Sequence, residues 1–239
     1  MSYSFDRDTG GEWKQDESKS GGRSERTWKD SETTSWIGGG CEAALPGTMS
    51  ALSWNCRGLR NPLIVKTLQK IVKEEDPTLV FLMETKFKAT KMEGVKRKTE
   101  RQHGLVVPSQ NHGGGLALLW RSTLKVDPLT YSPRRINVMV NEEDEKKKWR
   151  FIGFYGDLKM SKREESWALI RNLNSKCKLP WVIIGDFNEL LHANKKDRGN
   201  VRPEGQMKVF RDTIDSCGLR DMGYIRSDFN WSRRLGAKG

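Results

Sequence analysis

Three short apolar runs in the chain end in polar residues of a restricted kind, and this pattern constrains the fold more than any other feature. The runs end in Ser53-Trp54-Asn55, Met83-Glu84-Thr85 and Ile184-Gly185-Asp186-Phe187-Asn188. Apolar runs of this length predict buried strands. Side chains at the ends of several strands of an α/β layer converge at one rim, where ligands bind. We therefore expect these polar residues to lie close together.

The segments around these runs predict a mixed α/β layer. Asn61-Pro62 supplies an N-cap and a first helical residue, and Ile64, Leu68, Ile71 and Val72 then share one helix face. With strands at 51–56 and 78–83 this makes a β-α-β unit. We predict further strands at 105–107, 116–120, 136–140, 149–155 and 181–184, and further helices at 90–102, from the capping box Ser161-x-x-Glu164, and from Pro203. Several consecutive strands have no helix between them, so part of the sheet is antiparallel.

The charge of the chain is divided unequally between two segments. The 239 residues have a formal net charge of +12, yet the first 48 hold nine acidic and six basic residues. This segment is rich in Gly, Ser and charged residues and has no apolar periodicity, so we predict a disordered tail and linker at 1–48 and a folded domain at 49–239. The domain then carries +15. Such a charge predicts a polyanionic partner, nucleic acid in preference to acidic lipid.

The sequence excludes several classes of protein. It has no apolar run of roughly 18 residues, as a membrane helix requires, and no apolar segment of a secretory signal. We therefore expect a protein that is not secreted and has no membrane partner. The four cysteines and three histidines are scattered without the spacing of zinc ligands, which excludes a zinc finger or a zinc deaminase.

The polar residues at the strand ends favour a hard divalent cation. Asn55, Glu84, Asp186 and Asn188 supply carboxylate and amide oxygens, which suit Mg²⁺ better than zinc. Phosphoester hydrolysis needs such a cation beside a carboxylate, because the cation neutralises phosphate charge while the carboxylate orients or deprotonates water. Asp and Asn are also common turn residues at strand exits, so a turn explains any one motif alone. Three motifs together favour a site.

Five sequence blocks follow one another along the chain: Leu52-Ser53-Trp54-Asn55-Cys56-Arg57-Gly58-Leu59, Val80-Phe81-Leu82-Met83-Glu84-Thr85-Lys86, Gly113-Gly114-Gly115-Leu116-Ala117, Phe154-Tyr155-Gly156 and Gly185-Asp186-Phe187-Asn188-Glu189. These blocks resemble those of the endonuclease/exonuclease/phosphatase superfamily, and more closely those of the apurinic-type endonuclease domain of plant non-LTR (LINE-type) retrotransposons. The resemblance covers about residues 49–234. It implies an α/β fold of the DNase I-like type, a four-layer α-β-β-α sandwich with two facing sheets and helices outside.

The resemblance also implies roles for individual residues. Glu84 would be the main ligand of Mg²⁺, with Mn²⁺ as an alternative ion, and Asn55 would lie beside it at the metal and phosphate. Asp186 would orient or activate the attacking water, and Asn188 would hold that water and a phosphate oxygen. Tyr155 would donate a hydrogen bond to the phosphate as charge develops. Catalysis would therefore depend on the ends of several strands.

The C-terminal part of the sequence departs from the family pattern. The segment Phe229–Arg234 resembles a DNA-contacting segment of the family, which makes Trp231 and Arg233 candidate substrate-binding residues, although Arg233 stands where the family has Asn. A downstream Asp motif and a terminal Ser-Asp-His have no counterpart, and His103, His112 and His192 do not match that His. We therefore expect a C-terminally incomplete domain with impaired catalysis.

The resulting functional hypothesis is a Mg²⁺-dependent endonuclease of retrotransposon origin that nicks DNA. We expect a monomer that acts in the nucleus, because DNA is its substrate, and otherwise a cytoplasmic protein. The alternative is a catalytically inactive remnant that still binds nucleic acid. Within the superfamily, the sequence blocks argue against a phosphatase of inositol phosphates or lipids, and they fit the transposon branch better than a repair enzyme for abasic sites.

Overall fold

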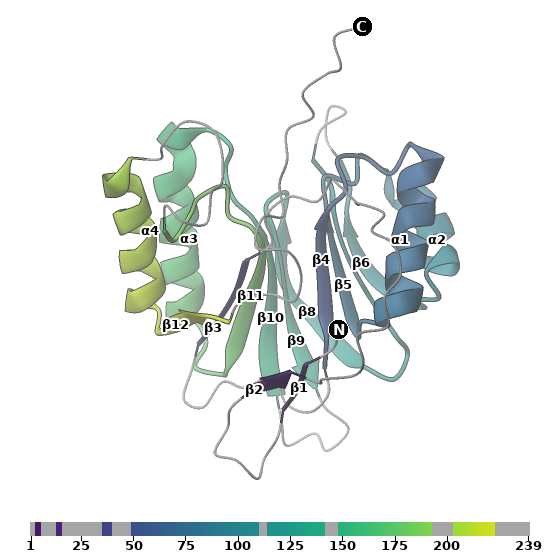
Figure 1. Ribbon diagram of the computed structural model, residues 1–239, viewed down its shortest axis with the longest axis horizontal. Helices are drawn as coiled ribbons and strands as arrows, with labels where there is room; N and C mark the ends of the chain where they lie inside the picture. The colour runs from purple at the N-terminus through teal and green to yellow at the C-terminus, as the bar shows by residue number, and fades with distance from the viewer. Residues whose placement is uncertain are drawn as a thin grey trace, which may run out of the picture.

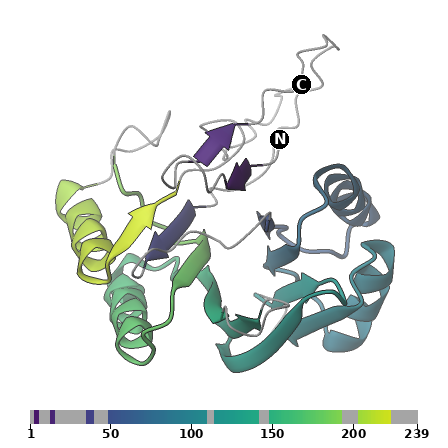
Figure 2. The same cartoon turned by 90° about the horizontal axis from the view of Figure 1, so that it is seen from below.

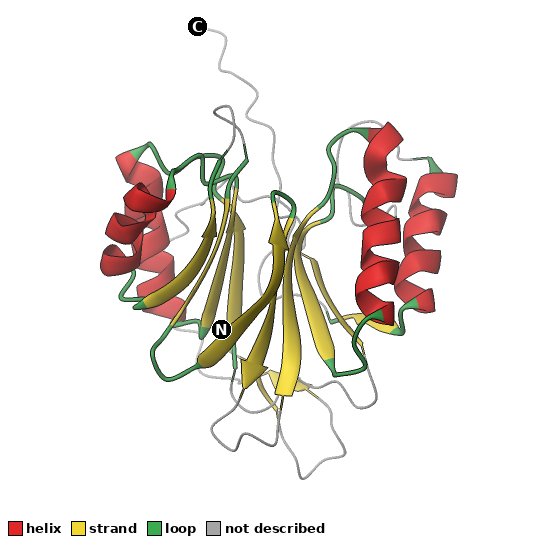
Figure 3. Cartoon of the chain, turned by 180° about the vertical axis from the view of Figure 1, so that it is seen from behind, coloured by secondary structure: helices red, strands yellow, loops and turns green. Residues whose placement is uncertain are grey.

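Two β-sheets face each other, and a pair of helices covers the outer side of each sheet (Figures 1 and 3). The computed structural model describes residues 49–109, 114–141, 148–192 and 203–222, and the backbone of three strands nearer the N-terminus: β1 (Tyr3–Phe5), β2 (Trp13–Gln15) and β3 (Ser35–Gly39). One apolar cluster lies between the sheets, and one lies between each sheet and its helices. The predicted α-β-β-α sandwich is confirmed.

The four-stranded sheet is built around the predicted β-α-β unit. Its order is β4 (Ala51–Asn55), β5 (Leu79–Met83), β7 (Leu116–Trp120) and β6 (His103–Val107), and it is covered by α1 (Pro62–Glu75) and α2 (Ala89–Lys98). β4 and β5 are parallel, with α1 between them. The Asn61 side chain accepts a hydrogen bond from the Leu63 N–H at 3.0 Å, so the predicted N-cap is confirmed. The buried face of α1 is Val65, Leu68 and Val72, whereas Ile64 and Ile71 are only partly buried.

The six-stranded sheet contains both parallel and antiparallel pairs. Its order is β12 (Leu219–Asp221), β3, β11 (Trp181–Asp186), β10 (Lys148–Tyr155), β9 (Arg135–Asn141) and β8 (Lys125–Ser132), and it is covered by α3 (Arg163–Ser175) and α4 (Glu204–Ser216). β10 and β11 are parallel. At Gly153 of β10 a Cβ atom would lie 2.3 Å from the Phe81 ring of β5, so only glycine lets the two sheets approach this closely.

Two element predictions were wrong in detail. The exposed strand β8 was not predicted, because it lies at a sheet edge and lacks a buried apolar run. Ser161 does not cap α3: it lies in a short 3₁₀ helix (Met160–Lys162), and the N-cap is Lys162, without a side-chain cap hydrogen bond. A tight 3₁₀ turn often precedes an α-helix and moves its start.

The segment 1–48, predicted to be a disordered tail, contributes the strands β1, β2 and β3. β3 lies antiparallel between β11 and β12, with Ile37 opposite Ile183 and Asp221. Residues 35–39 were missed because two apolar residues between Ser and Gly are too short a pattern to indicate a strand. Apart from the backbone of these three strands, the segment 1–48 lies outside the described residues.

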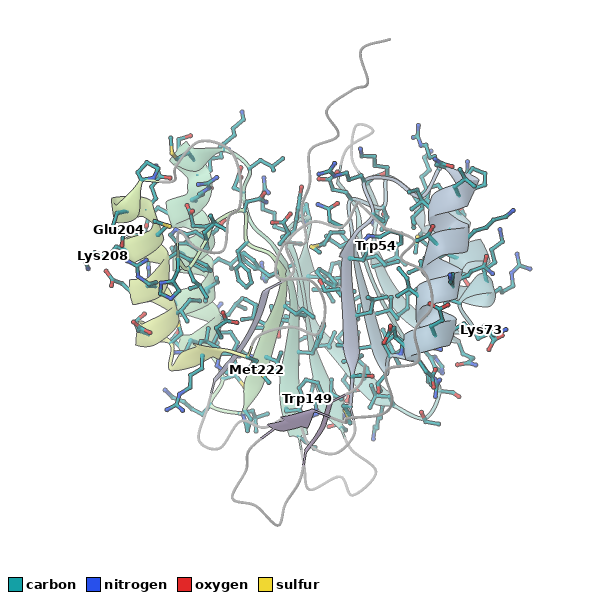
Figure 4. The ribbon with its side chains drawn as sticks, viewed as in Figure 1. Trp54, Lys73, Trp149, Glu204, Lys208 and Met222 are labelled. Carbon is teal, nitrogen blue, oxygen red and sulfur yellow. The ribbon has the colours of Figure 1, made fainter. Side chains whose placement is uncertain are left out.

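The outer surfaces of the helices are polar. Lys73 on α1 and Glu204 and Lys208 on α4 lie on the sides of the molecule that face away from the sheets (Figure 4). In the view from below, the helix pairs α1/α2 and α3/α4 lie at opposite ends of the molecule (Figure 2). Among the helices that the structure describes, none combines the length and apolar character that a membrane crossing would need.

Candidate active site

Four strands from the two sheets bring their carboxyl ends to one rim. β4 and β5 run parallel in one sheet, and β10 and β11 run parallel in the other, with Tyr155 opposite Asp186. β11 lies against β4 across the interface between the sheets. Asn55 ends β4, Glu84 follows β5, and Tyr155 and Asp186 end β10 and β11. The expectation that the polar strand ends converge is met by the geometry.

Hydrogen bonds connect these side chains directly. The Asn55 amide Nδ2 lies 3.5 Å from Glu84 Oε1 and 3.4 Å from Asp186 Oδ2, so one amide bridges the carboxylates of the two sheets. The Tyr155 hydroxyl donates to Glu84 Oε1 at 2.5 Å. Asn55, Tyr155 and Asp186 are all buried, whereas the Glu84 side chain is 20% exposed. Glu84 is thus the member of the cluster most open to solvent.

Asn188 is held by the loop that follows β11. Its backbone N–H donates to Asp186 Oδ1 at 2.9 Å, and its side-chain Nδ2 donates to the Gly156 carbonyl at 2.9 Å. The Gly156 N–H in turn donates to the Asp186 carbonyl at 2.7 Å. A Cβ on Gly156 would lie 2.2 Å from the Phe187 carbonyl oxygen, so a side chain there would break this contact. The loop fixes the orientation of both Asp186 and Asn188.

The turn after β5 has an unusual backbone that directs Glu84 toward the other sheet. Glu84 and Lys86 have φ angles of 51° and 53°, in the left-handed region that non-glycine residues rarely occupy. The Thr85 N–H between them donates to the Gly115 carbonyl at 3.1 Å. A Cβ on Gly115 would lie 2.5 Å from Thr85 Oγ1. The glycine-rich block therefore packs against the turn that carries Glu84. Strained backbone of this kind concentrates at functional sites.

A buried thiol lies directly beside the cluster. Cys56 donates its S–H to the Met83 carbonyl at 3.0 Å. Burial raises the pKa of Cys56 to about 12, and the negative charge of Glu84 adds to the increase. The thiol is therefore neutral at physiological pH and is neither a nucleophile nor a thiolate ligand.

The donor set at the rim suits a hard cation that keeps other ligands of its own. Within the described ranges, no group of three His, Cys, Asp or Glu side chains is placed to hold a metal ion. Mg²⁺ is usually held by one or two carboxylates and completes its shell with water and substrate phosphates. Glu84 and Asp186, with the Asn55 amide between them, fit that mode better than a cage made of protein ligands alone.

The structure brings five of the predicted site residues together: Asn55, Glu84, Tyr155, Asp186 and Asn188. Trp231 and Arg233, the predicted substrate-binding residues, lie outside the described residues. Sequence reasoning missed Lys86, whose Nζ lies 3.7 Å from Glu84 Oε2. It also missed the role of Gly156, whose backbone N–H and carbonyl bond to Asp186 and Asn188. Both lie inside the quoted blocks, but no sequence pattern shows which way a side chain turns.

Comparison with known proteins identifies the family and supports the fold. The family profile described as the Endonuclease/Exonuclease/phosphatase family matches residues 52–233. The fold is similar to an AP endonuclease from Leishmania major (TM-score 0.55, 12% identity, 71% of this chain and 66% of that one). It is similar to an AP endonuclease from Archaeoglobus fulgidus (TM-score 0.54, 14% identity, 70% of each chain). It also resembles a 3′ phosphatase from Neisseria bound to a product DNA hairpin (TM-score 0.52, 17% identity, 70% of each chain).

These likenesses are likenesses of fold. These identities lie below 20%, and the chain spans 66–70% of the length of these three structures and 64% of the human Nocturnin catalytic domain. No curated protein matches the chain.

Proposed function

Because this chain belongs to the endonuclease/exonuclease/phosphatase family, we propose that it is a Mg²⁺-dependent phosphodiester hydrolase of the nuclease type and that its substrate is DNA. The observation that carries the proposal is the Asn55 amide, which joins Glu84 and Asp186 across the two sheets. A phosphodiesterase needs one acidic group for a cation and another for water, held at a fixed separation. The formal charge of +12 supports a polyanionic substrate.

The side chains divide into two functional groups. Glu84, the most open carboxylate, and Asn55 would hold the cation; when bound, Mg²⁺ would neutralise charge on the phosphate. Asp186 is buried and is fixed by the Asn55 amide and the Asn188 N–H, so it is suited to orient or deprotonate a water molecule.

Tyr155 and Asn188 would assist with hydrogen bonds. The Tyr155 hydroxyl donates to Glu84 Oε1, and that bond keeps the carboxylate turned toward the rim. The same hydroxyl would donate to a phosphate oxygen of a bound substrate. Asn188 is oriented through the Gly156 carbonyl and would help to hold the attacking water. Donors that are fixed before the substrate arrives stabilise developing charge most effectively.

The proposal is tested by nicking of supercoiled plasmid in Mg²⁺. The full chain, Asp186→Asn and Asp212→Asn are compared, because Asp212 on α4 is exposed, pairs with Lys208 and offers an equal loss of charge. We expect Asp186→Asn to lower the nicking rate by about 10²–10⁴-fold, the usual contribution of a general base. Asp212→Asn should match the parent chain.

If Asp186→Asn nicks plasmid as fast as the parent chain does, even where both rates are slow, the proposed chemistry is excluded. Replacement of Mg²⁺ by Mn²⁺ tests the choice of ion in the same assay, and removal of Mg²⁺ with a chelator tests whether an ion is needed. If plasmid binding persists without nicking in any variant, the chain is a nucleic-acid-binding protein and not an enzyme. Binding of either kind weakens steeply between about 50 and 200 mM salt, because phosphate contacts release counterions.

The finer parts of the proposal rest on sequence resemblance. We propose an origin in a plant non-LTR retrotransposon and action on nuclear DNA, supported by the blocks around Asn55, Glu84 and Asp186. Because these 239 residues lack counterparts of the downstream Asp and His motifs, we expect a protein of this sequence alone to nick slowly. Parallel assays on intact duplex and on duplex with one abasic site distinguish a retrotransposon-type nicking enzyme from a repair enzyme.

A further inference from the structure

A pocket of about 190 Å³ lies on the outer face of the six-stranded sheet, on the side away from the interface between the sheets. Arg150 lies five residues before Tyr155 on β10, which at about 3.3 Å per residue places it roughly 17 Å from the candidate active site. Its neighbours Phe151 and Trp149 point into the core between the sheets, so Arg150 points outward. The lining residues come from β8, β9, β10 and the end of α3: Leu129, Thr130, Arg135, Asn137, Arg150, Asn172, Leu173, Lys176 and Cys177.

The pocket is cationic, and among the described residues no acidic side chain lines it. Arg135, Arg150 and Lys176 contribute three positive charges. Arg150 is 1% exposed; its terminal amino group donates to the Leu173 carbonyl at 2.9 Å, and its guanidinium lies 5.2 Å from the Trp181 ring centroid. The carbonyl end of α3 offsets about half a charge. Burial lowers the pKa of both arginines, which reflects the cost of holding these charges away from water.

Three buried polar atoms in the pocket have no hydrogen-bond partner within the described residues: Arg150 Nε, Arg135 Nε and Asn137 Oδ1. Asn137 is 5% exposed and uses its Nδ2 to donate to Thr130 Oγ1 at 3.1 Å. Two of the atoms are N–H donors on cations and the third is an acceptor. Buried polar groups are normally satisfied, so each of these needs a partner that the described residues do not supply.

An unpartnered Nε alone would not indicate a ligand, because the buried Arg101 and Arg163 also have one. Those two arginines, however, form ion pairs with Asp76 and Glu189. Among the three buried arginines that the structure describes, Arg150 is the one without a carboxylate partner. The Arg150 guanidinium contacts the Leu173 carbonyl, the Trp181 ring and the Cys177 side chain, none of which is a carboxylate, and its Nε is left for another group.

We propose that this pocket binds a small oxyanion that also carries a hydroxyl group, with inorganic phosphate as the best fit. Its oxygens would accept hydrogen bonds from Arg150 and Arg135, and its hydroxyl would donate to Asn137 Oδ1. The volume corresponds to roughly six water molecules, which suits a free phosphate and is too small for a whole nucleotide. This site is independent of the proposed nuclease chemistry, since it lies on the other face of the sheet.

The first test measures thermal unfolding of the full chain in phosphate, sulfate and chloride at equal ionic strength and pH 7.5. Phosphate carries a hydroxyl at this pH and sulfate does not. At a phosphate concentration ten times its Kd we expect the Tm to rise by about 3–6 °C, with a smaller rise in sulfate. Phenyl phosphate, a monoester without the hydroxyl at this pH, distinguishes free phosphate from a phosphate ester.

The second test follows alkylation of Cys177, which lines the pocket and is half-buried. Peptide mass spectrometry separates it from the other cysteines, and the buried Cys56 and Cys217 serve as references. At ten times Kd, phosphate should slow the modification of Cys177 by about tenfold, because about a tenth of the protein remains unliganded. A general effect of salt on stability would not act on this one thiol.

Three variants test which residues bind the phosphate. Arg135→Gln removes one half-buried donor and should weaken phosphate binding by about tenfold or more, as expected for a charge-assisted hydrogen bond. Arg150→Met should abolish binding, and if this variant does not fold, Arg135→Gln decides. Lys178→Gln, exposed and outside the pocket, loses the same charge and should respond like the parent chain.

An equal response of Arg135→Gln and Lys178→Gln, or a Tm rise without protection of Cys177, would overturn the site. Equal protection by sulfate and phosphate would overturn the pairing of a ligand hydroxyl with Asn137.

Discussion

The two ends of α3 each lie beside a buried arginine, and the two arginines are satisfied in different ways. At the N-terminal end, Arg163 forms an ion pair with Glu189 at 2.7 Å, and Glu189 directly follows Asn188 in the chain. At the C-terminal end, Arg150 donates to the Leu173 carbonyl and has no carboxylate partner among the described residues. A cation at a helix N-terminus is unfavourable, whereas one at the C-terminus is favourable.

The comparison extends to the two sites. At the rim, Asn55, Glu84, Tyr155 and Asp186 satisfy one another, so the candidate active site is held in shape before any ligand binds. In the pocket around Arg150, other atoms of the same side chains are bonded, but Arg150 Nε, Arg135 Nε and Asn137 Oδ1 have no hydrogen-bond partner among the described residues. Side chains that bond each other form a preorganised site, whereas unpartnered side chains indicate a group that is still to bind.

The largest expected effect comes from removing each arginine while keeping its volume. Arg163→Met removes the ion-pair partner of Glu189, whose side chain is 1% exposed, so we expect a loss of about 3–5 kcal/mol in the free energy of unfolding. Arg150→Met leaves no buried carboxylate and loses one hydrogen bond to a carbonyl, which costs about 1 kcal/mol. Urea denaturation of both variants in phosphate-free buffer measures the difference. Equal losses would mean that Arg150 has an acidic partner after all.

The next largest effect is on catalytic activity, and it tests whether the hydrogen bonds at the rim are needed for nicking. Asn55→Ala removes the amide that bridges Glu84 and Asp186, so we expect the nicking rate to fall by about 10²–10³-fold, as when one preorganised donor is lost. Asn174→Ala on α3 is the matched control, since this asparagine lies outside both sites. Initial rates of plasmid nicking provide the measurement. Activity in Asn55→Ala near that of the control would show that the bridge does not organise the site.

The sequence predicted the rim far better than the pocket, and the reason is physical. Asn55, Glu84 and Asp186 each follow an apolar strand, so the periodicity of the strands located them. Arg150 lies inside a strand, where its outward direction depends on pairing with β9 and on coverage by α3. Likewise, the left-handed backbone at Glu84 and the strand β3 depend on tertiary contacts that no local pattern encodes.

A smaller effect tests the burial of the rim through pH. The pKa of Cys56 is raised from 9.0 to about 12, mainly by burial, so above pH 9 the unfolded chain loses this proton while the folded chain keeps it. Stability is then lost as pH rises, by up to about 1.4 kcal/mol per pH unit between pH 9 and 12. We expect the parent chain to lose about 1.4 kcal/mol more than Cys56→Ala between pH 8 and pH 10. Identical pH profiles in urea denaturation would show that Cys56 titrates normally.

The smallest expected effect concerns Lys86, whose Nζ lies 3.7 Å from Glu84 Oε2 and whose side chain is about one third exposed. Its charge competes with a divalent ion for Glu84. A pair of charges about 4 Å apart in water interacts by about 1 kcal/mol, so Lys86→Met should lower the Mg²⁺ concentration for half-maximal nicking by at most about fivefold. Lys88→Met, exposed two residues further on, should leave it unchanged. An increase in the Mg²⁺ requirement of Lys86→Met would mean that Lys86 positions Glu84 for the ion and does not compete with it. The direction of the change therefore shows whether the carboxylates at the rim stay organised without the Lys86 charge. In the pocket around Arg150, by contrast, removal of the arginine is expected to abolish binding.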